Sequence, residues 1–265
     1  MNGLNLSALR TLLMLLSLAL LLGCKGPSTK PLPPPEVKGE KSPERIKRII
    51  NERTGSIRTV EGHLTIVSRG GASPGRCKAV LFFKRPSQLR LKAFQTFGPS
   101  LFDLLMEESL IQVYIPEQNK VFKADLKEET RKQESGLTPL GLMMGIFQVG
   151  IDDSEQLSLS QDPQGDVVLN HFREGRLVKK TEIDPQSFFI KREALIGAGG
   201  KPYLITTYGE YKKTDGQWWP FRIQLHQPAQ GQFMSFEFQS VKINGPIDPE
   251  IFKLTVPPGV TTVHQ

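Results

Sequence analysis

From residue 56 onward, apolar and polar residues alternate along most of the chain. In residues 88–94, for example, Leu89 and Leu91 alternate with Arg90 and Lys92. A period of two is typical of β-strands that bury one face, and Gly, Pro, Asn and Asp between such runs are typical of turns. The pattern predicts about a dozen strands, over residues 56–67, 76–84, 88–94, 101–107, 110–115, 120–125, 156–160, 166–172, 177–183, 188–195, 203–211, 219–227 and 232–244.

Two segments have helical spacing instead. Residues 45–53 follow Ser42 and Pro43, a cap and a first-turn proline, and carry a stripe of isoleucines. Residues 138–147 also begin with a cap and a proline, but their apolar side chains lie nearly all round the helix: Leu140, Leu142, Met143, Met144, Ile146 and Phe147. An ordinary surface helix keeps a polar face. We therefore expect this second helix to be buried or inserted into another part of the protein.

The number of strands limits the form of the sheet. A flat sheet of about a dozen strands leaves a whole face and its edges open. We therefore expect a mainly β domain over residues 43–265, with a single strongly curved antiparallel sheet, an unclosed β-barrel, and the two short helices as lids in its concave mouth. In the last long strand, Phe236 and Phe238 share one parity while Val241 and Ile243 share the other. This change predicts a β-bulge near residues 239–240.

The N-terminal residues differ from the rest of the chain. Residues 12–22 are almost wholly apolar, a length typical of a signal-peptide core and short of the ~20 residues that span a bilayer. The segment Leu21-Leu22-Gly23-Cys24 then resembles the lipobox of bacterial lipoproteins. The resemblance implies that residues 1–23 are a signal peptide, and that Cys24 becomes acylated, with palmitate among the chains, and anchors the protein to a membrane. Lys25, which is not Asp, favours the outer membrane by the enterobacterial sorting rule.

Residues 24–42 contain several prolines and have no apolar periodicity. Proline lacks the N–H that helices and sheets use, so this segment is expected to be an extended tether that holds the domain in the periplasm. The net charge of the chain is +7, and loss of Arg10 with the signal peptide leaves +6. This excess is compatible with attraction to anionic lipid and with a role in solubility alone. The basic residues show no pattern typical of nucleic-acid binding.

The sequence contains no arrangement typical of an enzyme. Nucleophile elbows, metal-ligand spacings and Gly-rich phosphate loops are missing. The four histidines, His63, His171, His226 and His264, lie far apart in the sequence. We therefore predict a non-enzymatic protein without a metal site or cofactor. Cys77, with Cys24 assigned to acylation, has no disulfide partner and is expected to be a buried, inert thiol.

The candidate functional feature is apolar. Thirteen side chains from the predicted strands could line a concave face that accepts acyl chains: Leu64, Ile66, Val80, Phe82, Leu89, Leu91, Leu104, Val113, Phe221, Ile223, Leu225, Phe236 and Phe238. The alternative is that they form an ordinary packed core. A cavity of several hundred Å³ would favour lipid handling, and a filled interior would favour a scaffold.

The order helix, strand meander, helical insertion and second meander over residues 45–260 resembles the LolA/LolB fold of the periplasmic lipoprotein carrier and its outer-membrane receptor. Residues 89–99 are similar to the receptor's strand, protruding loop and following strand. In the receptor, an exposed apolar residue on that loop is needed to place lipoproteins in the outer membrane, and Phe97 holds the matching position here. The helix at 137–147 matches the lid. Residues 208–211, 219–220 and 247–252 are similar to uncharacterised lipoproteins with related domains.

The resemblance implies an outer-membrane lipoprotein that binds acyl chains and accepts or inserts lipoproteins, with a periplasmic carrier protein as a partner. The alternative is a non-transporting envelope lipoprotein that senses or scaffolds a lipid, lipopolysaccharide or a protein. Residues 101 and 102 either begin the strand after the Phe97 loop or belong to an apolar loop tip.

Overall fold

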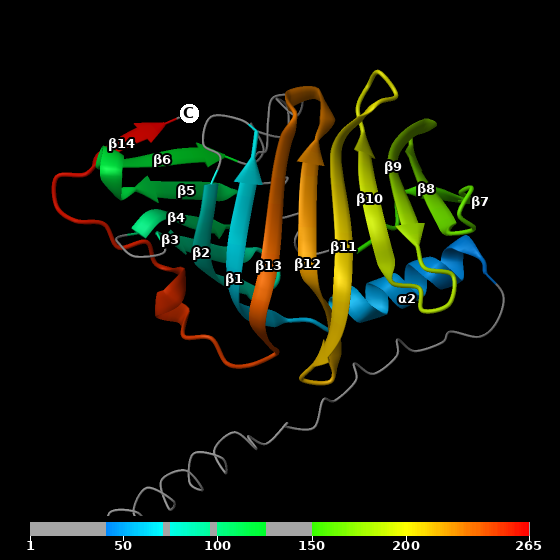
Figure 1. Cartoon of the computed structure of the whole chain (residues 1–265), viewed down its shortest axis with the longest axis horizontal. Helices are drawn as coiled ribbons and strands as arrows, with labels where there is room; N and C mark the ends of the chain where they lie inside the picture. Colours follow the sequence, from blue (N-terminus) through cyan, green and yellow to red (C-terminus); the bar gives the residue numbers. More distant parts are fainter. Residues whose placement is uncertain (1–40, 71–74, 96–99, 126–149, 265) are drawn as a thin grey trace, which may run out of the picture. The chain divides into compact units, whose positions relative to one another are not determined.

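The computed structural model describes residues 41–70, 75–95, 100–125 and 150–264. In these residues, one α-helix and three short 3-10 helices accompany a sheet of fourteen strands (Figure 1). The helices are α2 (Pro43–Gly55), η1 (Pro116–Gln118), η3 (Pro228–Gln230) and η4 (Pro249–Phe252). The strands are β1 (Thr59–Arg69), β2 (Gly75–Lys84), β3 (Gln88–Phe94), β4 (Ser100–Glu107), β5 (Leu110–Ile115), β6 (Lys120–Asp125), β7 (Gln156–Gln161), β8 (Val167–Arg173), β9 (Arg176–Ile183), β10 (Ile190–Ile196), β11 (Pro202–Thr214), β12 (Gln217–Gln227), β13 (Gln232–Ile243) and β14 (Thr261–His264).

The strand order confirms the unclosed sheet that the sequence predicts. It runs β14-β6-β5-β4-β3-β2-β1-β13-β12-β11-β10-β9-β8-β7, so β1 and β13 join two meanders and the sheet keeps two separate edges. Strands β3, β5 and β6 have the predicted bounds. Strand β14 was not predicted, and it pairs with β6 in parallel, whereas the other described pairs are antiparallel.

Helix α2 has the predicted cap. The Ser42 hydroxyl accepts a hydrogen bond from the Arg45 amide at 3.3 Å, and Pro43 lies in the first turn. On the face of α2 that points away from solvent, Ile46 and Ile50 are buried in the core. The Asn51 side chain bonds both main-chain groups of Ile151, with Nδ2 3.0 Å from the carbonyl oxygen and Oδ1 2.7 Å from the amide nitrogen. These contacts tie α2 to the segment that precedes β7. The predicted helix over 137–147 lies outside the described residues.

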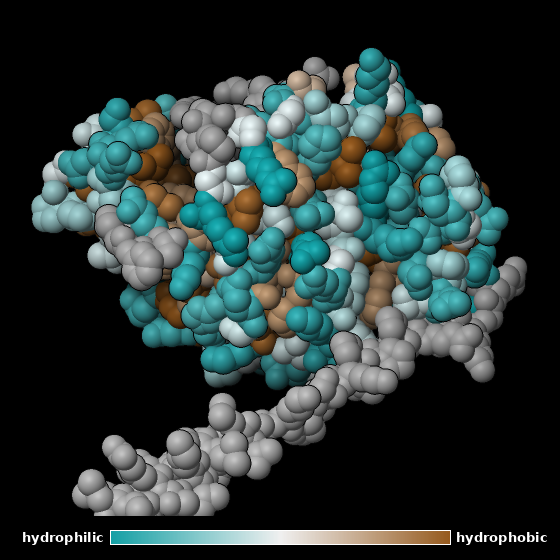
Figure 2. All heavy atoms as spheres, in the orientation of Figure 1, coloured by the Kyte–Doolittle hydropathy of each residue, from teal (hydrophilic) through white to brown (hydrophobic). Residues whose placement is uncertain are grey.

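The two faces of the sheet follow from strand parity. We call the face that carries Val60, Leu64 and Ile66 of β1 the inner face, together with their cross-strand partners such as Phe83 and Phe236. These side chains are 0–5% exposed and form the core with α2. The outer face carries charged side chains, and in the view of Figure 2 hydrophilic residues dominate, with hydrophobic ones in separate patches.

The predicted bulge lies in β13. His63 pairs with Ser240 and Leu64 with Phe238, so Gln239 is an extra residue without a partner in β1. Because of this extra residue, Phe236, Phe238, Val241 and Ile243 can all be buried despite their different parities.

The chain after β13 covers part of the outer face. Arg90 forms an ion pair with the buried carboxylate of Asp103 at 2.6 Å, and its Nη1 donates to the main-chain oxygen of Ile251 at 2.6 Å. Phe252 of η4 is buried beside them. The short helix η4 therefore packs against the outside of β3.

Candidate functional site

A cavity of about 530 Å³ opens on the inner face. Its walls come from β1 to β5 and β13, and most of the lining is apolar. The lining residues are Ile66, Ser68, Gly75, Arg76, Cys77, Leu91, Leu101, Phe102, Leu104, Val113, Ile115 and Met234. Ligand pockets for small molecules commonly measure roughly 300–1,000 Å³. The cavity is therefore large enough for a ligand, and the described lining favours an apolar one.

Strand register explains why these residues meet. Ile66 pairs with Cys77 across β1 and β2, while Leu91 pairs with Leu104, which pairs in turn with Val113. Directly opposite residues of antiparallel strands point to the same face, so both rows of paired residues lie on one side of the sheet. A register shift between Ala93 and Phe94 marks an irregularity at the start of β4.

The predicted lining residues fall into three groups. Four of them line the cavity: Ile66, Leu91, Leu104 and Val113. Seven lie buried in the core of the inner face without lining the cavity: Leu64, Leu89, Phe221, Ile223, Leu225, Phe236 and Phe238. The interior therefore combines a packed core with a cavity at one side.

Val80 and Phe82 require a correction. Val80 pairs with His63 and Lys92, and Phe82 pairs with Arg90, so both lie on the outer face. Residues 79–83 are apolar at both odd and even positions, and the prediction places the even positions on the inner face. The inner face of β2 instead carries Cys77, Ala79, Leu81 and Phe83.

Sequence reasoning also missed several lining residues. Leu101 and Phe102 belong to β4, as the first of the two interpretations held, and both line the cavity. Ile115 shares the parity of Val113, and Met234 that of Phe236, so strict use of the period of two would have found them. For Cys77, the sequence predicts only an inert thiol and no place in the cavity wall.

Cys77 is a free thiol in the cavity wall, and it is half-buried. Burial raises the pKa of this thiol above its ordinary value of 9.0, because the thiolate loses solvation. At neutral pH the group is therefore protonated and behaves as a small apolar surface.

The other predicted site residues lie outside the described residues. They are Cys24, Phe97 and the lid residues Leu140, Leu142, Met143, Met144, Ile146 and Phe147. The strand that follows the segment of Phe97 is β4, and its second and third residues, Leu101 and Phe102, line the cavity.

At the far end of the sheet, the inner face carries a buried polar cluster. His171 is 0% exposed, with Nδ1 2.7 Å from the Glu155 carboxylate and Nε2 2.9 Å from the Thr181 hydroxyl. Glu193 accepts a hydrogen bond from the Tyr208 hydroxyl at 2.8 Å. Hydrogen bonds of this kind satisfy polar groups that would otherwise be costly to bury.

The charge state of this cluster follows from its surroundings. Burial lowers the pKa of His171 below its ordinary value of 6.5, and the hydrogen bond to Glu155 opposes this effect. The same hydrogen bond lowers the pKa of Glu155. At neutral pH, a neutral His171 therefore faces an ionised Glu155. Among the described residues, no group of three or more His, Cys, Asp or Glu side chains is placed to hold a metal ion.

Comparison with known proteins shows the fold alone. No family model and no curated protein matches this chain. A DUF1329 family protein from Desulfovibrio piger matches with a TM-score of 0.60 at 10% identity, over 80% of this chain and 95% of that one. A candidate outer membrane lipoprotein-sorting protein domain from Vibrio parahaemolyticus matches with a TM-score of 0.57 at 11% identity, over 80% and 97%. A LolA superfamily protein from Nitrosomonas europaea matches with a TM-score of 0.56 at 13% identity, over 78% and 97%.

These likenesses confirm the LolA/LolB-like fold that the order of elements predicts. Within the described ranges, no helix combines the length and apolarity that crossing a bilayer requires.

Proposed function

We propose that this protein is an outer-membrane lipoprotein that binds acyl chains in the inner-face cavity and accepts or inserts lipoproteins. The observation that carries the proposal is the cavity of about 530 Å³ with its largely apolar wall. The fold shared with a LolA superfamily protein supports it. The role needs no catalytic group, and the protein is proposed to be a carrier or receptor, not an enzyme.

The energetics suit a ligand that must be released again. Burial of an acyl chain gains about 0.8 kcal/mol per CH₂ group. A single chain therefore binds usefully but reversibly, and transfer between proteins or to a membrane requires such reversibility. Cys24, acylated after cleavage of residues 1–23, would anchor the protein, and residues 24–42 would let the domain reach a lipid-bearing partner in the periplasm.

Cys77 provides a direct test of acyl binding. In the mature chain with Cys24→Ser, Cys77 is the one remaining thiol of the two in the sequence. Because Cys77 lines the cavity, saturating monolaurin, a neutral single-chain lipid, should slow its modification by N-ethylmaleimide at least tenfold. An unchanged rate of modification would refute acyl binding in this cavity.

Two valine variants control this experiment. Val113→Trp fills the cavity and should abolish the protection that monolaurin gives to Cys77. Val80→Trp places the same side chain on the outer face, where protection should persist. The comparison is between rates with and without lipid for each variant, so any shielding by the tryptophan itself cancels.

Transfer is tested separately from binding. Phe97→Glu should leave the protection of Cys77 by monolaurin intact but abolish insertion of a purified lipoprotein into outer-membrane vesicles. Full insertion by this variant would remove the role proposed for Phe97. If the unaltered protein binds monolaurin but inserts nothing, the alternative of a non-transporting envelope lipoprotein replaces the proposal.

A further inference from the structure

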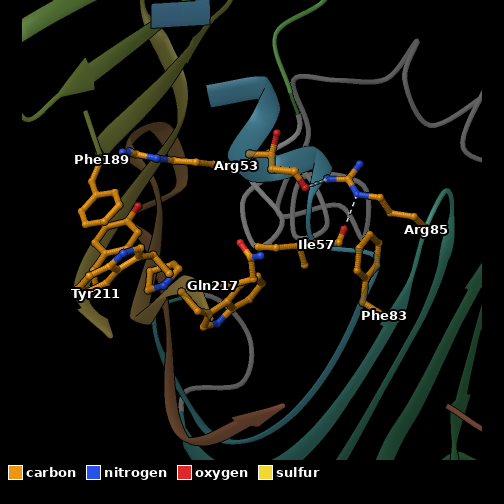
Figure 3. A pocket seen from close by; sticks show the side chains of 11 residues that line it. Arg53, Ile57, Phe83, Arg85, Phe189, Tyr211 and Gln217 are labelled. Carbon is orange, nitrogen blue, oxygen red and sulfur yellow. Dashed lines mark hydrogen bonds between the residues drawn. The ribbon is translucent and has the colours of Figure 1, made fainter. Parts of the chain in front are cut away.

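A second pocket lies where α2 ends beside the β11–β12 hairpin. It measures about 60 Å³, several times the ~10–15 Å³ that one water molecule needs. Its lining residues are Arg53, Thr54, Ile57, Phe83, Arg85, Phe189, Tyr211, Gln217, Trp218, Trp219 and Pro220. Figure 3 shows Phe189 and Tyr211 on one side, Phe83 and Arg85 on the other, and Ile57 and Gln217 between them. The pocket can hold a small chemical group, not a whole lipid.

Two guanidinium groups border this pocket, and both are held by neutral oxygens. Arg53 Nη1 donates to the main-chain oxygens of Ser187 at 2.8 Å and Phe188 at 3.1 Å. Arg85 donates from Nε to Ile57 and from Nη2 to Thr54, each at 2.7 Å. These bonds fix the direction of both side chains.

Neither guanidinium has a counter-charge in the described part of the chain. No described carboxylate lies within 4.0 Å of either one, and the eleven lining residues include no Asp or Glu. Burial lowers the pKa of Arg53 and of Arg85, because both cations lose solvation. A partly desolvated charge without an opposite charge is costly, and a bound anion would offset that cost.

Aromatic rings hold Arg53 at the pocket wall. Phe189 stacks on Tyr211 with ring centroids 4.3 Å apart, and the Arg53 guanidinium carbon lies 4.9 Å from the Phe189 centroid. Trp218 lies 5.4 Å from Phe189 in a tilted arrangement. The rings restrict the guanidinium, so little side-chain entropy remains to be lost when it binds a ligand.

The hydrogen bonds to main-chain oxygens do not use all the N–H donors of Arg53 and Arg85. A guanidinium has five N–H groups, and among the described residues Arg53 bonds only through Nη1 while Arg85 bonds through Nε and Nη2. The remaining N–H groups of two arginines in one small pocket match the oxygens of a phosphate group, which accepts several hydrogen bonds at once.

We propose that the pocket between Arg53, Arg85 and Gln217 binds a phosphate group, either free or on a lipid headgroup. This pocket shares no lining residue with the acyl-binding cavity.

The protein carries its own reporter for this site. Both tryptophans of the sequence, Trp218 and Trp219, line the pocket. Inorganic phosphate, titrated into the mature chain at constant ionic strength against chloride, should give a saturable change in tryptophan fluorescence. Dihexanoyl phosphatidic acid and dihexanoyl phosphatidylcholine form the lipid arms of the experiment.

Gln217→Glu is the decisive variant. Oε1 of Gln217 lies 2.9 Å from the Ser56 hydroxyl. Glutamate has nearly the same shape as glutamine and keeps an acceptor oxygen for this hydroxyl. It also places a carboxylate between the two arginines. The variant should fold with an unchanged or higher Tm and lose phosphate affinity at least tenfold. Arg53→Gln should lose at least as much, and circular dichroism checks its fold.

Arg69→Gln is the matched control. Arg69 also lies over an aromatic ring, with its guanidinium carbon 5.9 Å from the Phe233 centroid, but it does not line this pocket. It should bind phosphate like the unaltered chain. Tighter binding of phosphatidic acid than of phosphate would identify a lipid headgroup, and equal affinities a free phosphate. No saturable signal with any of the three probes, or full affinity in Gln217→Glu, would overturn the proposal.

Discussion

At the scale of single residues, His171 shows how hydrogen bonds within the domain satisfy a polar side chain that is buried away from water. Its ring bonds Glu155 on one side and Thr181 on the other, and the charged groups Glu193, Lys179 and Arg173 lie around this pair. Removing one member of such a cluster leaves the others unpaired, and each unpaired buried group costs about 1–3 kcal/mol. The cluster therefore ties β8 and β9 to the start of β7.

The lowered pKa of His171 predicts a pH dependence of stability. In the unfolded chain the imidazole takes up a proton near pH 6.5, whereas in the folded chain it does so at a lower pH. Between these two values the unfolded state binds more protons, so the free energy of unfolding falls with decreasing pH, by up to about 1.4 kcal/mol per pH unit. Urea denaturation between pH 7.5 and 5 measures this slope.

His171→Gln is the control, because glutamine keeps one donor and one acceptor but does not titrate. The variant should be less stable at pH 7.5 and show a shallower slope below pH 6.5. Glu155, whose pKa is also lowered, contributes stability that is lost only below about pH 4.5, so its effect falls in a separate range. Equal slopes in both proteins would contradict the assignment to His171.

At the scale of the element, the bulge in β13 decides which side chains the strand buries. Val241 is 6% exposed and Ile243 3%, although their parity differs from that of Phe236 and Phe238. The extra residue Gln239 corrects the alternation in the middle of the strand. Without it, a strand with this sequence could bury only one of its two halves.

Deletion of Gln239 should therefore destabilise the domain strongly. The deletion turns Val241 and Ile243 to the outer face, and each lost burial costs about 1.5–3 kcal/mol. Gln239→Ala keeps the extra residue and loses only the hydrogen bonds from Nε2 to the Thr65 hydroxyl and to the main-chain oxygen of Glu237, so it should cost about 0.5–1.5 kcal/mol for each bond. Urea midpoints compare the two, and a deletion no worse than the alanine variant would show that the bulge has no role in register.

The individual strands also show which structural features the sequence pattern predicts and which it does not. Runs with clean alternation, such as Gln88–Phe94, predict both the strand and the buried side. The run 79–83 is apolar at every position, so it predicts the strand but not its face, and Val80 and Phe82 were assigned to the wrong side. Strand β14 is short and mostly exposed, and its parallel pairing with β6 depends on how far the chain travels after η4, which no local pattern encodes.

At the scale of the whole domain, the inner face divides into two structurally different regions. The side formed by β1 to β5 and β13 contains the cavity, whereas the side formed by β7 to β11 is filled by α2 and the polar cluster around His171. The sequence could predict an apolar interior but not the division. A cavity is space that side chains fail to fill, and its existence depends on the curvature of the sheet and on register as much as on residue type.

If the cavity and the Arg53 pocket are separate sites, their ligands should stabilise the delipidated mature chain independently. A ligand at 100 times its Kd adds about 2.7 kcal/mol to the free energy of unfolding, and contributions from uncoupled sites add within about 0.5 kcal/mol. Monolaurin and inorganic phosphate together should therefore give the sum of their separate effects in urea denaturation.

Val113→Trp should lose only the stabilisation by monolaurin, and Gln217→Glu should lose only the stabilisation by phosphate, because each residue lines only one of the two sites. If either variant removed both effects, the two sites would be coupled, and the ligand would be better described as one lipid whose chain and headgroup occupy both.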